Sequence, residues 1–387
     1  MGSLAYFYLD FHKMPQKLRF INNAHAAFFS TTRLRVDTYF KEHSLSKHAN
    51  TAMWGKTIFF LASFVSVYLL ILLGDLPVPA MAALGVLLGV LSACIGFNIC
   101  HDAIHGAFSS DRRVNKTLGL IFNFIGANPY VWSITHNQVH HTYTNIPGHD
   151  EDLEIAPGLV RITEDEPLSK MHRYQHLYGL ALYGLASLSW VLRKDYVKFF
   201  QKSIGQVPTL NHPRKEYFNL FFYKAVYYGL FIALPLVVLD VTWWQFALGF
   251  LLMHFAEGMV LGSVFQLAHV VEGTSFPEPN LEGNIEESWA AHQMQTTANF
   301  APRSAFAAFF CGGLNRQIEH HLFPKICHIH YPAISGIVQE TALEFGLPYL
   351  ENKSFLMALR SHHRLLLRFG KEEHEKREEL SRQPAFS

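Results

Sequence analysis

The stretch His136-Asn-Gln-Val-His140-His141 has the residue types and the spacing of a metal site. If it is helical, His136 and His140 lie four residues apart on one face, and His141 lies about 100° round the axis. Three imidazoles then converge on one side of the helix. Imidazole nitrogen binds zinc, copper and iron, so the ligand type alone does not select a metal.

Two similar clusters occur elsewhere in the chain. His101-Asp-Ala-Ile-His105 precedes the first stretch, and Gln317-Ile-Glu-His320-His321 lies near the C-terminal side. A single His-x-x-x-His pair arises readily by chance in a chain with 23 histidines. Three clusters, two of them with an adjacent histidine pair, therefore indicate metal binding.

The number of candidate ligands indicates two metal ions. The three clusters supply seven histidines, and His269, in Gln266-Leu-Ala-His269, is a candidate eighth. Eight imidazoles exceed what one tetrahedral zinc or one octahedral ion with an open position can use. The candidate ligands are His101, His105, His136, His140, His141, His269, His320 and His321.

The remaining histidines and the cysteines lack such spacing. His292, His328 and His330 are interpreted as core or interface residues, because a lone histidine usually finds a hydrogen-bond partner there. His362-His363 lies among arginines and is expected on a solvated face. None of the four cysteines forms a Cys-x-x-Cys pair, so neither a disulfide scaffold nor a thiolate site is predicted.

The elements that must position these histidines are apolar. Of the 387 residues, 50% are hydrophobic and only 16% are charged, which is typical of a membrane protein. The net charge of +1 gives no overall field that would favour nucleic acid as a partner. Four runs are close to the roughly 20 residues that cross a hydrocarbon core. They are Thr57–Leu73, Val78–Ile99, Phe218–Leu239 and Trp243–Leu267.

The topology follows from parity. If all three clusters build one site, the chain must cross the membrane an even number of times between each pair of clusters. Leu177–Leu192, also apolar, is therefore expected to lie in or on the membrane without crossing. Thr117–Val131 is too short and too interrupted to span. The prediction is an all-α integral membrane protein with four transmembrane helices and a cytoplasmic helical cap that holds the metals.

The charge pattern agrees with this orientation. Lysines and arginines flank the spans on the proposed cytoplasmic side, whereas the two opposite turns carry only Asp75 and Asp240. We expect an N-terminal cytoplasmic or interfacial segment (1–56), a membrane domain (57–350) and a charged C-terminal tail (351–387). Within the first, Lys17–Phe40 either lies on the membrane surface as an amphipathic helix or packs on the main domain.

Acidic residues near the clusters have two readings. Asp150, Glu151, Asp152 and Glu154 follow the second cluster and form either a solvated turn or a set of carboxylates that orient ligand imidazoles. Asp102 and Glu319, inside the first and third clusters, are further candidates for that outer shell.

The clusters, their order and their flanking phrases resemble the membrane fatty acid desaturase family. The resemblance runs from about Ile95 to Tyr331. It includes His136-Asn-Gln-Val-His140-His141-Thr-Tyr-Thr-Asn145 and Gly312-Gly-Leu-Asn-Arg-Gln317-Ile-Glu-His320-His321-Leu-Phe-Pro324. It implies four spans and a cytoplasmic di-iron centre, with the eight histidines as ligands. It also implies an enzyme that uses O2 and two electrons to place a double bond in a fatty acyl chain carried as acyl-CoA or acyl-lipid.

Gln317 stands where many desaturases have the first histidine of their third cluster. This substitution resembles the front-end subgroup, which desaturates between an existing double bond and the carboxyl end. A neutral amide has a carbonyl acceptor and an NH2 donor, so Gln317 could bind iron weakly through oxygen or hold a water beside it. We therefore expect Gln317 to take part in catalysis.

One feature of the subgroup is missing from this sequence. Many front-end desaturases carry a fused cytochrome b5 module with a His-Pro-Gly-Gly signature, but here His212-Pro213 is followed by Arg214. Electrons are therefore expected from an external ferredoxin, or from cytochrome b5 with its reductase. A hydroxylase of the same superfamily is the nearest alternative. A metal-transporting membrane protein is the alternative from another class, although it would require ligands within the spans.

Overall fold

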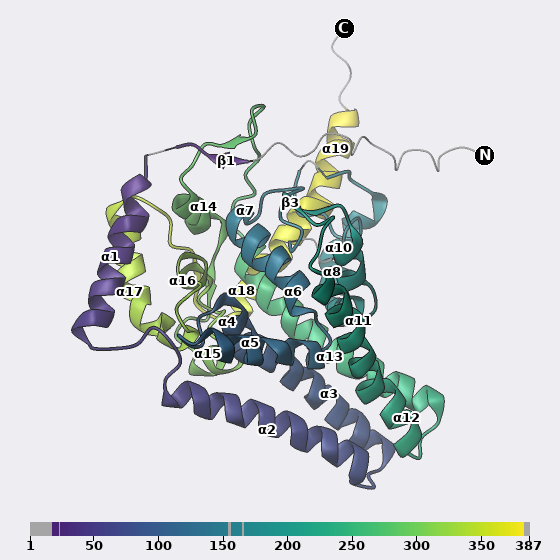
Figure 1. The fold of residues 1–387 in the computed structure, drawn as a ribbon. Helices are drawn as coiled ribbons and strands as arrows, with labels where there is room; N and C mark the ends of the chain where they lie inside the picture. The colour runs from purple at the N-terminus through teal and green to yellow at the C-terminus, as the bar shows by residue number, and fades with distance from the viewer. Residues whose placement is uncertain (1–17, 23, 154–155, 165, 383–387) are drawn as a thin grey trace.

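The computed structural model describes residues 18–22, 24–153, 156–164 and 166–382, and these are mostly helical (Figure 1). Long helices fill the lower and right part of the view, and shorter helices gather above them. The long helices there are α2 (Thr51–Leu73), α3 (Val78–Ile95), α11 (Arg214–Tyr228) and α13 (Trp243–His269), and the short α12 (Leu234–Val238) precedes α13.

Four continuous helical stretches are long and apolar enough to cross a membrane, as the sequence predicts. They are Thr51–Leu73, Val78–His105, Arg214–Val238 and Trp243–His269. The second combines α3, the π-helix η1 (Gly96–Cys100) and α4 (His101–His105), and the third joins α11 to α12 through η6 (Gly229–Ala233). The second stretch is longer than the expected Val78–Ile99, because the helix continues through the first histidine cluster.

The outer faces of these helices suit lipid rather than water. Large apolar side chains are exposed along α2, α11 and α13, among them Ile58, Phe59, Phe218, Phe222 and Leu251. Trp243 and Trp244 are exposed at the start of α13, where aromatic residues favour a headgroup boundary. An exposed apolar surface of this extent marks a membrane contact in a folded protein.

The apolar stretch Leu177–Leu192 is divided into short pieces. These are α8 (Gln175–Tyr183), α9 (Ala186–Ser189), η5 (Trp190–Lys194) and α10 (Asp195–Phe200). None of them is a candidate span, in line with the expectation that this stretch does not cross. It packs on α13, where Gly258 leaves room for the Gly184 carbonyl. A buried ion pair between Lys224 and Asp195 (2.8 Å) ties it to α11.

Helix α1 (Ala26–Glu42) decides between the two readings of the N-terminal segment. Its apolar face, with Phe28, Val36 and Phe40, packs in one buried cluster with Ile334 and Val338 of α17 (Tyr331–Glu344). The helix therefore covers the main domain. The first part of the predicted Lys17–Phe40 helix differs, since Arg19–Phe20 is a short strand and Lys17 lies outside the described residues.

The C-terminal segment also packs against the rest of the protein. Helix α18 (Phe355–Leu367) buries His362, whose ring nitrogens lie 2.8 Å from the Tyr183 hydroxyl and 2.6 Å from the Val270 carbonyl oxygen. The solvated-face interpretation is wrong for His362 and holds for the exposed His363. An amphipathic helix buries one apolar face. The many charged residues of this segment make that apolar face difficult to recognise in the sequence.

The remaining elements are short. The helices are α5 (Arg112–Leu120), η2 (Ile121–Ile125), α6 (Pro129–Trp132), η3 (Ser133–His140), α7 (His141–Tyr143), η4 (Lys170–Tyr174), α14 (Trp289–Thr296), α15 (Ala305–Phe310), α16 (Gln317–Leu322), η7 (His328–His330), η8 (Arg368–Glu372) and α19 (Glu373–Arg382). Three two-residue strand pairs complete the fold: β1 (Arg19–Phe20) with β4 (Asn284–Ile285), β2 (Ser203–Ile204) with β3 (Val207–Pro208), and β5 (Asn299–Phe300) with β6 (Glu351–Asn352).

Candidate metal centre

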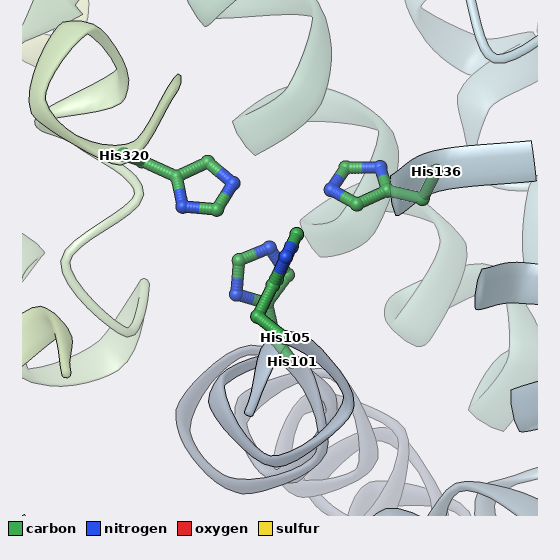
Figure 2. A group of neighbouring side chains, drawn as sticks. All are labelled: His101, His105, His136 and His320. Atoms are coloured by element: carbon green, nitrogen blue, oxygen red, sulfur yellow. The ribbon is translucent and has the colours of Figure 1, made fainter. Parts of the chain in front are cut away.

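Four histidines from three separate elements point their rings toward a common centre (Figure 2). His101 and His105 are the first and last residues of α4, His136 comes from η3 and His320 from α16. Each offers a nitrogen, and these four nitrogens lie within 4.8 Å of one another. Such spacing is what imidazoles need to share one metal ion.

A second group lies beside the first. His140, His269 and His321 bring their nitrogens together within the same limit of 4.8 Å. His141 joins the two groups, because its ring centroid lies 4.6 Å from that of His320 and 4.4 Å from that of His321. The structure thus brings all eight predicted histidines into one cluster with two centres.

Local helix geometry explains how the sequence clusters become spatial ones. The second cluster lies on a π-helix, η3, and the first follows a π-helix, η1; such turns are rare and are often found at functional sites. His136 and His140 still share a face, with their rings stacked at 5.0 Å. Gly312, at φ +59°, carries the loop before α16 against η1, since a Cβ there would meet the Phe97 carbonyl at 2.5 Å.

The hydrogen bonds of the cluster leave the Nε2 atoms of five histidines without a partner. The Nδ1 atoms of five histidines lie near outer partners: His140 to Asp150 (2.8 Å), His136 to Asp152 (3.3 Å), His320 to the Tyr331 hydroxyl (3.1 Å), His321 to the Gln293 Oε1 (2.7 Å) and His269 to the Thr296 carbonyl (3.3 Å). Buried Nε2 atoms of His105, His136, His140, His141 and His320 have no hydrogen-bond partner. Buried nitrogens without partners are costly in a protein. In a metal-binding histidine, one ring nitrogen typically bonds to an outer partner and the other ring nitrogen faces the metal. This set of donor atoms therefore fits a pair of metal ions.

Burial keeps most of these imidazoles neutral. Burial and the neighbouring imidazoles hold the pKa values of His136, His141, His320 and His321 well below 6.5. Burial also opposes the charged form of His140, but the Asp150 carboxylate outweighs it and raises the pKa of His140. At neutral pH the four histidines with lowered pKa values present a lone pair, as metal binding requires.

Gln317 lies at the second group. Its Nε2 is 2.9 Å from the His269 Nε2 and 3.3 Å from the His321 Nε2, and its Oε1 is buried without a partner. The side chain is 3% exposed. An amide in this place can turn either its oxygen or its NH2 group toward the metal position.

Comparisons with known proteins agree with this site. The family model for fatty acid desaturases matches residues 77–353. The chain belongs to the fatty acid desaturase family. An sn-1 linoleoyl-lipid 6-desaturase of Synechocystis is 36% identical over 343 residues, which are 87% of this chain and 94% of that protein. An acyl-lipid (8-3)-desaturase of Physcomitrium patens is 34% identical over 345 residues, 89% of this chain and 72% of that protein. The sn-1 linoleoyl-lipid 6-desaturase of Arthrospira platensis is 35% identical, over 84% of this chain and 88% of that protein.

The protein is thus a desaturase, an oxidoreductase that introduces a double bond into a fatty acyl chain. An apolar cavity of about 140 Å³ lies beside its histidines. His101, His136 and Gln317 line one part of it, and Asp152 and Lys194 also contribute. Its apolar walls include Phe97, Phe122, Trp132, Trp190, Leu261 and Phe265.

Only some of the acidic residues near this desaturase site contact candidate ligands, and the sequence alone does not reveal which ones. Asp150 and Asp152 contact ligand candidates, as one reading of the acidic loop predicts. Glu151 instead pairs with Lys198 and accepts a hydrogen bond from the Gly205 amide. Glu154 lies outside the described residues.

The two carboxylates inside the clusters have different partners. Asp102 accepts hydrogen bonds from the His328 backbone and ring and is 3.9 Å from the His101 Nδ1. Glu319 accepts hydrogen bonds from Asn299 and Tyr349, not from a candidate ligand. Asp102 thus keeps an ionic contact with one candidate ligand, as expected, whereas the hydrogen bonds of Glu319 go to other residues.

The outer partners Tyr331, Gln293 and Thr296 come from positions that sequence reasoning did not single out. Two of them, Gln293 and Thr296, lie on α14, beside the buried His292. His328 lies apart from the eight, in a buried group with Asp102 and Cys327, and the Lys56 Nζ is 3.1 Å from its Nε2. No spacing in the sequence marks these residues.

Proposed function

We propose that this desaturase acts on acyl-lipids and is of the front-end type, with two iron ions held by the eight histidines. His101, His105, His136 and His320 would hold one ion. His140, His269 and His321 would hold the other, with His141 beside both. Bound iron would supply the activation of O2 and the oxidising power that an unactivated alkyl chain requires. The observation that carries the proposal is the pair of inward-facing histidine groups beside an apolar cavity.

The cavity supports an acyl substrate. An alkyl chain offers no polar group by which to orient it, so its position must come from shape and exclusion of water. The rings of Phe122, Trp132 and Trp190 give rigid apolar walls next to His101 and His136. These walls would hold one carbon pair beside the metals and keep water away from it.

The outer partners would fix the ligand geometry. Asp150 accepts the Nδ1 proton of His140, and Asp152 contacts the Nδ1 of His136, which leaves each Nε2 for the metal. Gln317 would contribute its amide oxygen, or a water held by it, at the second ion. The negative carboxylates also offset part of the positive charge that neutral imidazoles leave uncompensated.

The names of the relatives support the substrate and the regiochemistry. They include sn-1 linoleoyl-lipid 6-desaturases, acyl-lipid (8-3)-desaturases and a probable Delta(5) fatty acid desaturase. The parity of the four candidate spans supports placing all eight histidines on one side, and the lysines and arginines beside the spans support the cytoplasmic side. Electrons would come from an external ferredoxin, or from cytochrome b5 with its reductase.

Expression in a host that lacks the activity, followed by analysis of its lipids, tests the proposal. We expect a new double bond between an existing one and the carboxyl end, found on intact glycerolipids, together with iron in the purified protein. A hydroxylated product would instead support hydroxylase chemistry. Metal uptake by the host without any new lipid would support a transporter. A double bond on the methyl side would contradict the front-end assignment.

A further inference from the structure

A second and larger opening reaches the histidine cluster from another side. It is a groove of about 860 Å³ between α5 and the first turns of α11, and it also contains residues of α4 and α6. His105, which belongs to the first group of histidines, lines the groove, and 9% of its surface is exposed. No other member of the eight histidines lines this groove.

The groove and the acyl cavity share no lining residue. Phe122 and Trp132 face the acyl cavity, whereas the next residues in the chain, Asn123 and Ser133, face the groove. The two histidines of α4 also line different openings: His101 lines the cavity and His105 lines the groove. An acyl chain in the cavity would therefore leave the groove free for another molecule.

The rim of the groove is basic. Arg112, Lys116, Lys215 and Lys325 line it and are exposed, and Glu216 is the one acidic residue among its lining residues. In the part of the chain that the structure describes, none of these four cations makes a side-chain hydrogen bond or an ion pair. Along the C-terminal helices, by contrast, Arg364, Lys371 and Arg377 each pair with a glutamate. The rim thus holds a local excess of unneutralised positive charge.

We propose that this groove is the docking site of an acidic one-electron carrier protein. The proposal rests on the proposed function, because desaturation needs a reductant. Two C–H bonds break and O2 takes up four electrons, two from those bonds and two from the carrier. Four protons, two from carbon and two from solvent, complete two water molecules. Two reduced carriers are oxidised for each double bond formed.

Two observations favour a protein carrier over the headgroup of an anionic lipid. A reductant must come close to the metals, and the groove brings its occupant to His105, whose ring lies 4.8 to 5.4 Å from those of His136, His141 and His320. A headgroup there would contact none of the residues that line the acyl cavity. Opposite charge on the partner raises the association rate and fixes its orientation.

Charge reversal on the rim tests the docking site. The test variant is Lys116→Glu with Lys215→Glu, and the matched control is Lys353→Glu with Arg360→Glu, two exposed cations outside the groove. Turnover is measured in vesicles of defined lipid with reduced ferredoxin or with a soluble cytochrome b5 domain, whichever gives the lower KM. It is measured again with dithionite and a small viologen mediator, which needs no docking site.

We expect the rim variant to raise the KM for the carrier on the order of ten- to a thousandfold at low salt, with a weaker salt dependence than the parent. Mediator-driven turnover and the KM for lipid should stay near those of the control. An unchanged carrier KM would overturn the docking site. A raised KM for lipid with an unchanged carrier KM would assign the groove to a headgroup instead. Absence of product with the mediator in the parent protein would contradict the proposed function itself.

Discussion

The substitution Asp150→Asn tests what an outer carboxylate contributes to iron binding while all candidate histidine ligands stay in place. Asp150 is 1% exposed, and its Oδ2 accepts both the His140 Nδ1 proton (2.8 Å) and the Asn145 amide (3.0 Å). Its Oδ1 accepts the Asp152 amide (3.2 Å). Asparagine has the same shape but only one oxygen. If that oxygen stays with His140, the new NH2 group faces the amide proton of Asp152.

The expected loss of iron affinity in Asp150→Asn follows from the lost charge and the lost hydrogen-bond acceptor. A hydrogen bond to a charged group contributes roughly 1.5–3 kcal/mol. Removing an outer partner of a metal-binding histidine typically lowers metal affinity by about 10- to 100-fold, or about 1.4–2.7 kcal/mol. Because the two ranges agree, we expect Asp150→Asn to weaken iron binding at the second histidine group by about 10- to 100-fold.

Glu319→Gln is the matched control. Glu319 is also fully buried and lies next to His320 in the chain, but its partners are Asn299 (2.9 Å) and Tyr349 (2.6 Å). It should therefore leave iron affinity within about twofold of the parent, which is below the range for a lost outer partner. Both variants and the parent are purified in detergent and titrated with a competing chelator, with thermal unfolding recorded in parallel.

Three results would contradict this role of Asp150. Parent-like iron affinity in Asp150→Asn would mean that the carboxylate does not support the ligand. An equal loss of affinity in both variants would mean that any buried charge near the site matters, whatever it contacts. A fall in unfolding temperature without a change in iron affinity would assign Asp150 to fold stability alone.

Tags placed after Arg112 and near Lys198 should report the same side of the membrane, and a tag in the 74–77 turn the other side. Protease protection in oriented vesicles measures this, and a Lys198 tag on the opposite side would show that 177–192 crosses. Gln317→Ala should keep most iron and lose turnover by roughly 10- to 100-fold, since the amide touches the site but the histidine pair remains. Parent-like product formation would make Gln317 a bystander. His140→Ala should abolish turnover and lower bound iron but leave membrane insertion intact, because the spans do not depend on metal; full activity would remove His140 from the ligand set.

The spans and the histidine clusters were predictable because both are local patterns. Apolar length marks a membrane-crossing helix such as Thr51–Leu73 wherever it occurs. The His136–His140 spacing places two side chains on one face, even though the turn proves to be a π-helix. His269 was found in the same way, since it ends the last span in Gln266-Leu-Ala-His269.

Asp150 and Asp152 were among the predicted outer partners, but the other outer partners were not predictable. Asp102 lies beside His101 in the sequence, but its hydrogen-bond partner is set by tertiary packing, which spacing along the chain does not reveal. Asp102 accordingly faces His328, 226 residues later in the chain. Partners such as Tyr331 and Gln293 reach the cluster through tertiary packing alone. Spacing along the chain carries no trace of such contacts.

The packing of two candidate membrane-spanning helices affects how far along the membrane normal each histidine group lies. Helices α3 and α13 both run toward the cluster and approach closely where a Cβ at Gly89 would collide with the Met253 backbone. His105 follows Gly89 by 16 residues and His269 follows Met253 by 16 residues, so the two histidines are the same number of residues away from that contact. One glycine thus brings a histidine of each group to the same level. The register of two apolar helices therefore contributes to the positions of those two histidines.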